Sequence, residues 1–161
     1  MPKDNTSVVV TGLGALTPVG NDVPTTWRAL VEGRSGIKRI TRFDPSPFET
    51  QIAGEVKGFA PQEHFDRKEA RRLDRFVQFA EVATRQALED AKLTINADNA
   101  ERVGVVIGTA VGGIETLLTE FEKFQARGPR RLSPFFLPMR VVISNSMGLG
   151  GHNACLIFRK L

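Results

Sequence analysis

The sequence predicts an α/β layered fold with mostly parallel strand pairing, and three observations carry this prediction. Residues 7–11 are a β-branched run typical of a strand, and residues 67–92 have the apolar periodicity of a helix. Residues 103–107 are apolar without alternation, as expected of a strand buried on both faces. Strands that alternate with helices favour a layered fold, and 161 residues, 41% of them hydrophobic and 25% charged, suffice for one globular domain.

The strand at residues 7–11 is followed by Gly-Leu-Gly at residues 12–14, which predicts a turn. A strand before Gly-x-Gly is also part of the dinucleotide-binding fingerprint. The third glycine of that fingerprint would fall at Thr17, and Pro18 follows it. A tight turn out of a buried strand explains the glycines equally well, so nucleotide binding is not the favoured interpretation.

A short helix is predicted over residues 25–33. Thr25 or Thr26 would cap its beginning, and Gly33 would end it. Between this helix and the long periodic segment the chain is rich in Pro and Gly. Within that stretch only residues 51–56 alternate as a strand does.

The long segment at residues 67–92 is predicted to be one amphipathic helix. Its apolar residues recur at the i, i+3, i+4, i+7 spacing of a single buried face. They are Leu73, Phe76, Val77, Ala80, Ala83, Ala87, Leu88 and Ala91. A second helix is predicted over residues 114–126, after a glycine-rich turn at residues 108–113 that lacks the Gly-Lys-Ser/Thr of a phosphate-binding loop.

The C-terminal part is predicted to contain two strands, residues 141–144 and 154–158, joined by a glycine-rich loop at residues 145–153. Its glycines permit positive φ and expose successive backbone N–H groups, which can stabilise an oxyanion. Glycine content alone favours a flexible hairpin connection. His152 is interpreted as structural, and Cys155 lies in an apolar strand, where a neutral buried thiol is expected.

Basic side chains gather on the predicted long helix, opposite its apolar face. Several of them fall within an arc of roughly 140° at 100° per residue. Like charges at i, i+4 are unfavourable, and a face adapted only for solubility would intersperse acidic residues. The stripe is therefore either a solvated face or a dock for an acidic partner, which a later loop can extend. The residues are Arg67, Lys68, Arg71, Arg72 and Arg75, with Arg130 and Arg131 on the loop.

Several other classes of function are disfavoured. The net charge of +4 is small, and no aromatic residues interleave with the basic ones, which argues against nucleic acid as partner. One cysteine and two distant histidines argue against a metal site. The N-terminal residues have no apolar signal core, and no apolar run has the length of a membrane span, so we expect a cytoplasmic protein.

Five segments, taken in order, resemble the β-ketoacyl-acyl-carrier-protein synthases, especially the type II condensing enzymes of fatty acid biosynthesis. The last segment, Asn-Ser-Met-Gly-Leu-Gly-Gly-His-Asn-Ala, is similar to that family's C-terminal Asn-Ser-Phe-Gly-Phe-Gly-Gly-Thr/His-Asn-Ala. Together the segments extend over nearly the whole chain. They are residues 9–20, 33–37, 67–76, 128–136 and 145–154.

The resemblance implies a thiolase-like layered fold of two similar halves and a homodimer. It implies decarboxylative condensation of an acyl group with malonyl carrier protein by a cysteine and two histidines, without a cofactor. Residues 1–140 are then part of the N-terminal half, and residues 141–161 are the terminal strand-loop-strand of the C-terminal half. The stretch between them, with the nucleophilic Thr-Ala-Cys motif and the catalytic histidines, has no counterpart in this sequence.

Some family positions do carry over. Lys68, Arg71, Arg72, Arg130 and Arg131 match positions that dock the acidic acyl carrier protein. The resemblance also implies an oxyanion and gating loop and positions of the acyl pocket. These are Gly148, Leu149 and Gly150 for the loop, and Val111 and Phe136 for the pocket.

The sequence thus predicts a protein of the synthase family that has no catalytic residue and no condensing activity by itself. Three alternatives remain open. The chain is a non-catalytic module that binds carrier protein, a module that pairs with an intact synthase, or the product of a deleted or mis-joined gene. The exposed apolar helix faces of an incomplete layered fold predict aggregation, a molten state or dependence on a partner chain.

Overall fold

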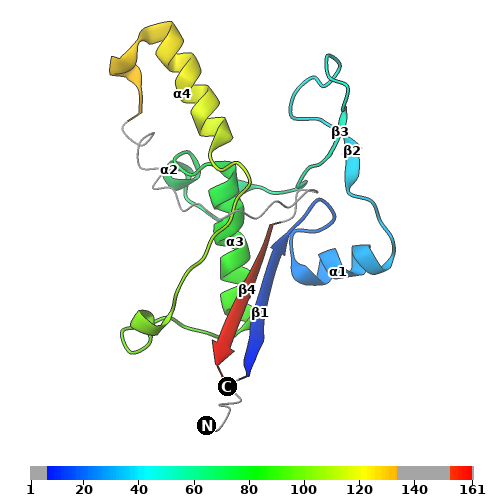
Figure 1. The fold of residues 1–161 in the computed structure, drawn as a ribbon, viewed down its shortest axis with the longest axis vertical. Coiled ribbons are helices and arrows are strands. Elements are labelled where there is room, and N and C mark those ends of the chain that lie inside the picture. Colours follow the sequence, from blue (N-terminus) through cyan, green and yellow to red (C-terminus); the bar gives the residue numbers. More distant parts are fainter. Residues whose placement is uncertain (1–6, 134–152, 161) are drawn as a thin grey trace, which may run out of the picture. The chain divides into compact units, whose positions relative to one another are not determined.

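The computed structural model, drawn as a ribbon in Figure 1, describes residues 7–133 and 153–160. These residues form two compact units. The first unit contains residues 7–59, 80–103 and 153–160 of the described chain, and the second contains residues 60–79 and 104–133. The predicted strand at residues 141–144 lies outside the described residues.

The first unit is built on a pair of antiparallel strands, β1 (Val8–Leu16) and β4 (Asn153–Lys160). Val8 pairs with Lys160 at one end and Leu16 with Asn153 at the other, with a register shift between Val10 and Gly12. The predicted strand at residues 154–158 is confirmed. The predicted turn at residues 12–14 is wrong, because β1 continues through both of its glycines.

The long helix α3 (Arg75–Asp90) explains the glycines of β1. A Cβ on Gly12 would lie 2.1 Å from the carbonyl oxygen of Ala87, and one on Gly14 would lie 1.8 Å from that of Ala83. Only glycine permits this approach of a helix to a strand. Ala83 and Ala87 are buried, as the helical periodicity predicted.

The helix α1 (Val23–Val31) confirms the predicted helix at residues 25–33, but its beginning differs. Asp22, rather than a threonine, is the N-cap, and its Oδ1 accepts a hydrogen bond of 2.6 Å from the N–H of Thr25. Pro24 fits the first turn because that position needs no N–H donor. Gly33 follows the helix with φ of 67°, as predicted for a C-terminal glycine.

A small hairpin completes the strands of the first unit. β3 (Ile52–Gly54) confirms the strand predicted at residues 51–56, and it pairs antiparallel with β2 (Ile37–Arg39), which was not predicted. The prediction of mostly parallel pairing is wrong for the described strands, since both sheets are antiparallel. Next to β3, hydrogen bonds from the hydroxyl and N–H of Thr41 lower the pKa of Glu55 to about 2, with a smaller contribution from Arg42.

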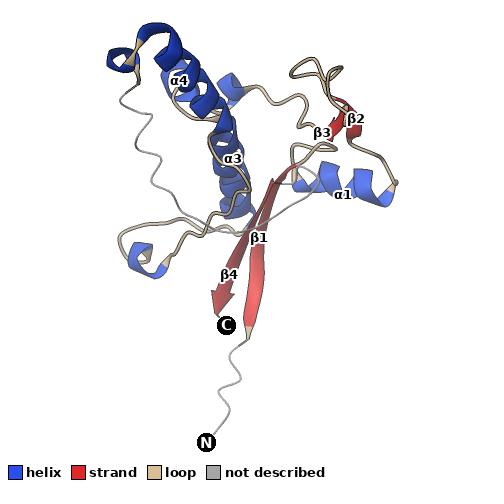
Figure 2. Cartoon of the chain, turned by 45° about the horizontal axis from the view of Figure 1, so that its top comes forward, coloured by secondary structure: helices blue, strands red, loops and turns tan. Residues whose placement is uncertain are grey.

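The second unit contains α2 (Arg67–Ala70), the first residues of α3, and α4 (Ile114–Arg127). Short 3₁₀ turns lie at η1 (Pro61–Glu63) and η3 (Pro129–Arg131), and a third, η2 (Ala100–Arg102), lies in the first unit. Figure 2 distinguishes these helices from the strands and loops. The helix predicted at residues 114–126 is confirmed.

Two predictions for this part of the chain are wrong. The continuous helix at residues 67–92 is broken, because α2 ends at Ala70 and α3 begins at Arg75. The strand predicted at residues 103–107 does not form; Val105 is 76% exposed and Val106 is 88% exposed. No helix among the described residues is long and apolar enough to cross a membrane.

Candidate functional site

The basic residues singled out in the sequence all lie in the second unit. Lys68 is on α2, Arg71 and Arg72 are in the turn that follows it, and η3 carries the remaining two. All five side chains are exposed. We call them the basic set: Lys68, Arg71, Arg72, Arg130 and Arg131.

The geometry predicted for the basic stripe needs correction. Because the helix stops at Ala70, Arg71 and Arg72 lie on a turn and not on one arc with Arg75. The i, i+4 relation predicted between Arg71 and Arg75 is interrupted by this break. α2 also carries the exposed Glu69, so its positive charge is local and not uniform.

The turn that bears Arg71 and Arg72 is held from two sides. Before it, Asp66 caps α2, accepting hydrogen bonds from the N–H groups of Lys68 (2.7 Å) and Glu69 (2.8 Å). After it, the buried side chain of Gln78 donates from Nε2 to the carbonyl oxygens of Ala70 (2.9 Å) and Leu73 (3.0 Å). The two bonds from Gln78 satisfy the carbonyl group of Ala70 at the end of α2 and that of Leu73 in the turn.

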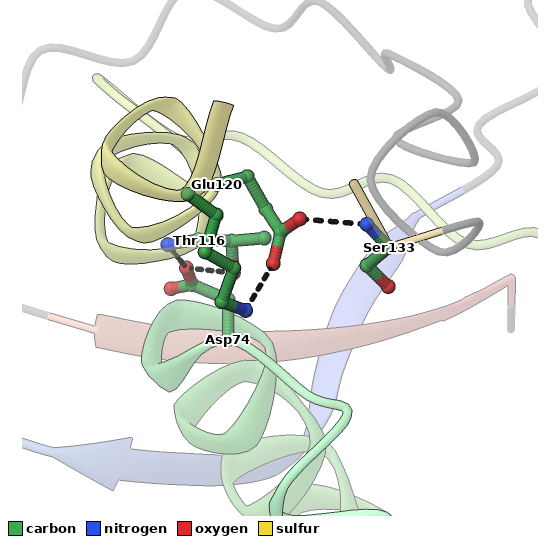
Figure 3. Close-up of polar contacts among 5 residues, drawn as sticks. Asp74, Thr116, Glu120 and Ser133 are labelled. Atoms are coloured by element: carbon green, nitrogen blue, oxygen red, sulfur yellow. Dashed lines mark hydrogen bonds and ion pairs between the residues drawn. The ribbon is translucent and has the colours of Figure 1, made fainter. Parts of the chain in front are cut away.

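Asp74 connects this turn to α4, as Figure 3 shows. Its Oδ2 accepts hydrogen bonds from the backbone N–H of Thr116 (2.9 Å) and from the hydroxyl of the same residue (2.7 Å). Its Oδ1 accepts from the N–H of Phe76 at 3.4 Å. One carboxylate therefore caps the first turn of α3 and binds the first turn of α4.

Glu120 extends the connection from α4 to the chain after η3. It is one helical turn beyond Thr116, it is only 4% exposed, and its two oxygens have different partners (Figure 3). Oε1 accepts from Nζ of Lys123 at 2.6 Å, and Oε2 accepts from the N–H of Ser133 at 2.7 Å. The ammonium of Lys123, and then the N–H of Ser133, lower the pKa of Glu120 against the opposing effect of burial.

This arrangement can attract and orient an anionic partner. Arginine presents a planar set of donors that fits carboxylates and phosphates, and lysine adds a flexible point charge. The turn at Arg71 and Arg72 has bonded backbone on both sides, so less freedom is lost when a partner binds. The second unit therefore carries exposed cations on a backbone fixed by Gln78, Asp74 and Glu120.

The supporting roles of Gln78, Asp74 and Glu120 were not predicted from the sequence. Asp74 precedes an apolar periodic run, which is the usual place of an N-cap, and this signal could have revealed the break between α2 and α3. Ser133, which bonds to Glu120, and Thr116, which bonds to Asp74, are 13 and 42 residues away from them in the sequence. Local patterns give no sign of such pairs.

Of the other predicted site residues, the structure describes only one pocket position. Val111 lies before α4 and is 62% exposed. The remaining pocket and loop positions fall outside the described residues: Phe136, Gly148, Leu149 and Gly150, with His152. Cys155 lies in β4, as predicted.

His64 is a described residue of metal-ligating type. His64 lies beside the ring of Phe65 in an edge-on contact, at 6.3 Å between ring centroids. Among residues 7–133 and 153–160, no group of three or more His, Cys, Asp or Glu side chains is placed to hold a metal ion.

Comparison with known proteins decides the family. Residues 5–152 match the family model described as the N-terminal domain of β-ketoacyl synthase, which is more than half of the chain. The chain belongs to the β-ketoacyl synthase family. It is 46% identical, over 161 residues, to 3-oxoacyl-[acyl-carrier-protein] synthase 2 of Staphylococcus aureus (strain COL), and the match covers 96% of this chain and 39% of that protein.

Other relatives agree with this family. A 3-oxoacyl-[acyl-carrier-protein] synthase 2 of Synechocystis sp. is 46% identical over 156 residues, covering 93% of this chain and 38% of the relative. This β-ketoacyl synthase chain therefore spans about two fifths of the length of the curated relatives that it matches.

Solved structures confirm the predicted thiolase-like fold, here in incomplete form. The ishigamide ketosynthase/chain length factor is similar with a TM-score of 0.63 and 31% identity, over 80% of this chain and 32% of that one. A type II PKS acyl-carrier protein in complex with its ketosynthase, bound to the hexaketide, includes a chain with a TM-score of 0.65 and 25% identity. That match covers 81% of this chain and 34% of the other.

Proposed function

We propose that this chain binds an acidic acyl carrier protein through its basic set. The observation that carries the proposal is the placement of five exposed cations in one unit, next to backbone fixed by buried or half-buried polar side chains. The names of the relatives support it, since they are synthases that act on acyl-carrier-protein substrates. A structural neighbour in complex with its carrier protein supports it independently.

Charge reversal tests this proposal. The variant K68E/R71E/R72E is expected to weaken binding of purified acyl carrier protein by at least about 100-fold in calorimetric titration at low salt. The matched control is R28E/R34E/K38E, which makes the same change of net charge at exposed residues of the first unit. If both variants lose the same affinity for acyl carrier protein, binding depends only on net charge, which would contradict the proposed site.

We further propose that this 161-residue chain carries out no condensation. A covalent acyl-enzyme needs an activated nucleophile, and the one cysteine of the sequence, Cys155, lies in a strand. Oxyanion donors alone do not replace that nucleophile. The purified chain, given acyl and malonyl carrier protein, is expected to form no β-ketoacyl product above background. Product that accumulates in proportion to the chain would refute this proposal.

The division of the chain predicted from the resemblance stands as a proposal as well. Residues 1–140 would be the first part of the N-terminal half, and residues 141–161 the terminal strand-loop-strand of the C-terminal half. Within this scheme Gly148, Leu149 and Gly150 form the oxyanion and gating loop, and Val111 and Phe136 contribute to an acyl pocket. Sequencing the encoding DNA around codons 137–145 tests the scheme, since an intervening stretch with Thr-Ala-Cys would return the parent enzyme.

A further inference from the structure

Glu120 is an unusual feature of a surface proposed to bind an acidic protein. It is a negative charge in the same unit as the basic set, and at 4% exposure it is largely removed from water. Burial of a carboxylate is unfavourable unless its oxygens are paired. Here both oxygens are paired, to Lys123 Nζ on one side and to the N–H of Ser133 on the other.

The bond to Ser133 fixes one end of the segment that carries Arg130 and Arg131. The other end is fixed where α4 stops, because the N–H of Gly128 donates to the carbonyl oxygen of Phe124 at 2.8 Å. Gly128 has φ of 72°, which turns the chain out of the helix into η3. The two arginines thus lie between two points that are both attached to α4.

From this geometry we infer that Glu120 is a positioning residue for Arg130 and Arg131. The inference rests on the proposed carrier-protein binding, and it adds to that site a residue that supports the contact residues from behind. Without the carboxylate, the segment after η3 loses its hydrogen bond to Glu120 on α4, and the backbone that carries the two arginines is less restrained. The partner must then order this segment when it binds, and the entropy lost in doing so lowers the affinity.

The sign of the charge effect makes the inference testable. If only the sum of charges mattered, removal of a negative charge would tighten binding of an acidic partner. If Glu120 positions the arginines, its removal weakens binding instead. The two explanations predict changes in opposite directions for the same substitution.

The first experiment compares Glu120→Gln with Glu122→Gln in the full chain, with purified acyl carrier protein as the probe. Glu122 is an exposed residue of the same helix, and its substitution makes the same change of charge. We expect E120Q to bind about tenfold more weakly, because its neutral amide offers one acceptor oxygen in place of two charged ones for the N–H of Ser133 and the ammonium of Lys123. We expect E122Q to bind as tightly as the unsubstituted chain or up to about twofold more tightly.

A second variant deletes the bond to Ser133 outright, without any change of charge. Ser133→Pro deletes the N–H that donates to Glu120, and Leu132, with φ of −66° and ψ of 141°, already has the conformation favoured before proline. S133P is expected to weaken binding to a similar extent, and the double variant E120Q/S133P no further. If E120Q disturbs α4, S133P still tests the role of this bond, because it leaves the residues of α4 unchanged.

A double-mutant cycle separates positioning from general destabilisation. In a chain that already carries R130A/R131A, E120Q is expected to cause no further loss, because the groups it positions are gone. In a chain with R71A/R72A, E120Q is expected to keep its roughly tenfold effect. A loss of equal size in both backgrounds would mean that Glu120 is merely structural and would overturn the inference.

The outcomes also separate the inference from the proposed function. Failure of the unsubstituted chain to bind carrier protein overturns the proposed function and, with it, the inference. Binding by the unsubstituted chain, with E120Q equal to or tighter than E122Q, overturns the inference alone. If E120Q and S133P weaken binding, and if this effect disappears in the R130A/R131A background, both the proposed function and the inference are supported.

Discussion

The strand β1 and the segment at residues 104–107 begin from similar sequences, valine-rich and close to glycines, but only β1 is a strand. β1 pairs along its length with β4. In addition, the N–H groups of Leu13 and Ala15 donate to Asp90 Oδ2 and Gln86 Oε1 on α3. Residues 104–107 are exposed and outside any strand. An apolar run therefore becomes a strand where other elements supply partners for its backbone.

Glycines show the same difference between the two regions. Gly14 lies against the backbone of Ala83, where an added Cβ would approach a carbonyl oxygen to 1.8 Å. Gly104 has no heavy atom within 4 Å of the position that a Cβ would occupy. Close packing in one region and open space in the other should therefore give the same substitution opposite consequences.

The largest expected effect comes from this pair. Gly14→Ala should destabilise the contact between β1 and α3 by about 3 kcal/mol, because the clash is with backbone and cannot be relieved by a rotamer change. Gly104→Ala should change stability by no more than about 0.5 kcal/mol. Hydrogen exchange of the amides in β1 and α3 measures both. Similar exchange rates in the two variants would mean that β1 and α3 are not packed as described.

The exposed region provides the second test. Because Val105 and Val106 are 76% and 88% exposed, we expect the chain to self-associate or to pair with another synthase chain. V105K and V106K should each raise the dissociation constant of that assembly about tenfold, from the loss of a buried valine. Analytical ultracentrifugation over a range of concentrations measures this.

Val31 offers a matched control for the valine variants. It is 70% exposed on α1, in the first unit, so V31K makes the same chemical change at a similar exposure. We expect V31K to leave the assembly unchanged. If it has the same effect as V106K, association is a general property of exposed apolar residues, and the contrast between the two regions fails.

The correct and the incorrect predictions of secondary structure differ for a physical reason. The periodicity behind α3 and α4 is local, and so is the positive φ at Gly33. A strand depends on partners elsewhere in the chain, so the turn predicted at residues 12–14 and the strand predicted at residues 103–107 were both wrong. Motif matches identified the family, which the comparisons confirm.

The candidate site was predictable only in part. The exposed cations could be found from their spacing and the resemblance, since exposure and charge are properties of single residues. Their support could not be found, because Asp74 and Glu120 act on backbone groups 42 and 13 residues away. The break at Asp74 also shows why a helical projection misplaced Arg71 and Arg72.

The smallest expected effect concerns the hydrogen bonds between α3 and β1. Gln86 accepts from the N–H of Ala15 at 3.0 Å and donates from Nε2 to the carbonyl oxygen of Asn21 at 2.8 Å, both in a partly buried setting. Gln86→Ala should speed hydrogen exchange at Ala15 about fivefold, which corresponds to roughly 1 kcal/mol. Asp90→Ala removes a bond to Leu13 in an exposed setting, where water can replace it, and should have less effect.

Gln86→Glu separates the two bonds of this side chain. Glutamate keeps an acceptor for Ala15 but loses the donor to the carbonyl oxygen of Asn21. Exchange at Ala15 should therefore stay slow in Q86E, while the region around Asn21 loosens. If Ala15 exchanges as slowly in Q86A and Q86E as in the unsubstituted chain, the bond to Gln86 adds nothing at Ala15, and strand pairing with β4 protects this part of β1. The difference between β1 and residues 104–107 would then depend on strand pairing and not on α3.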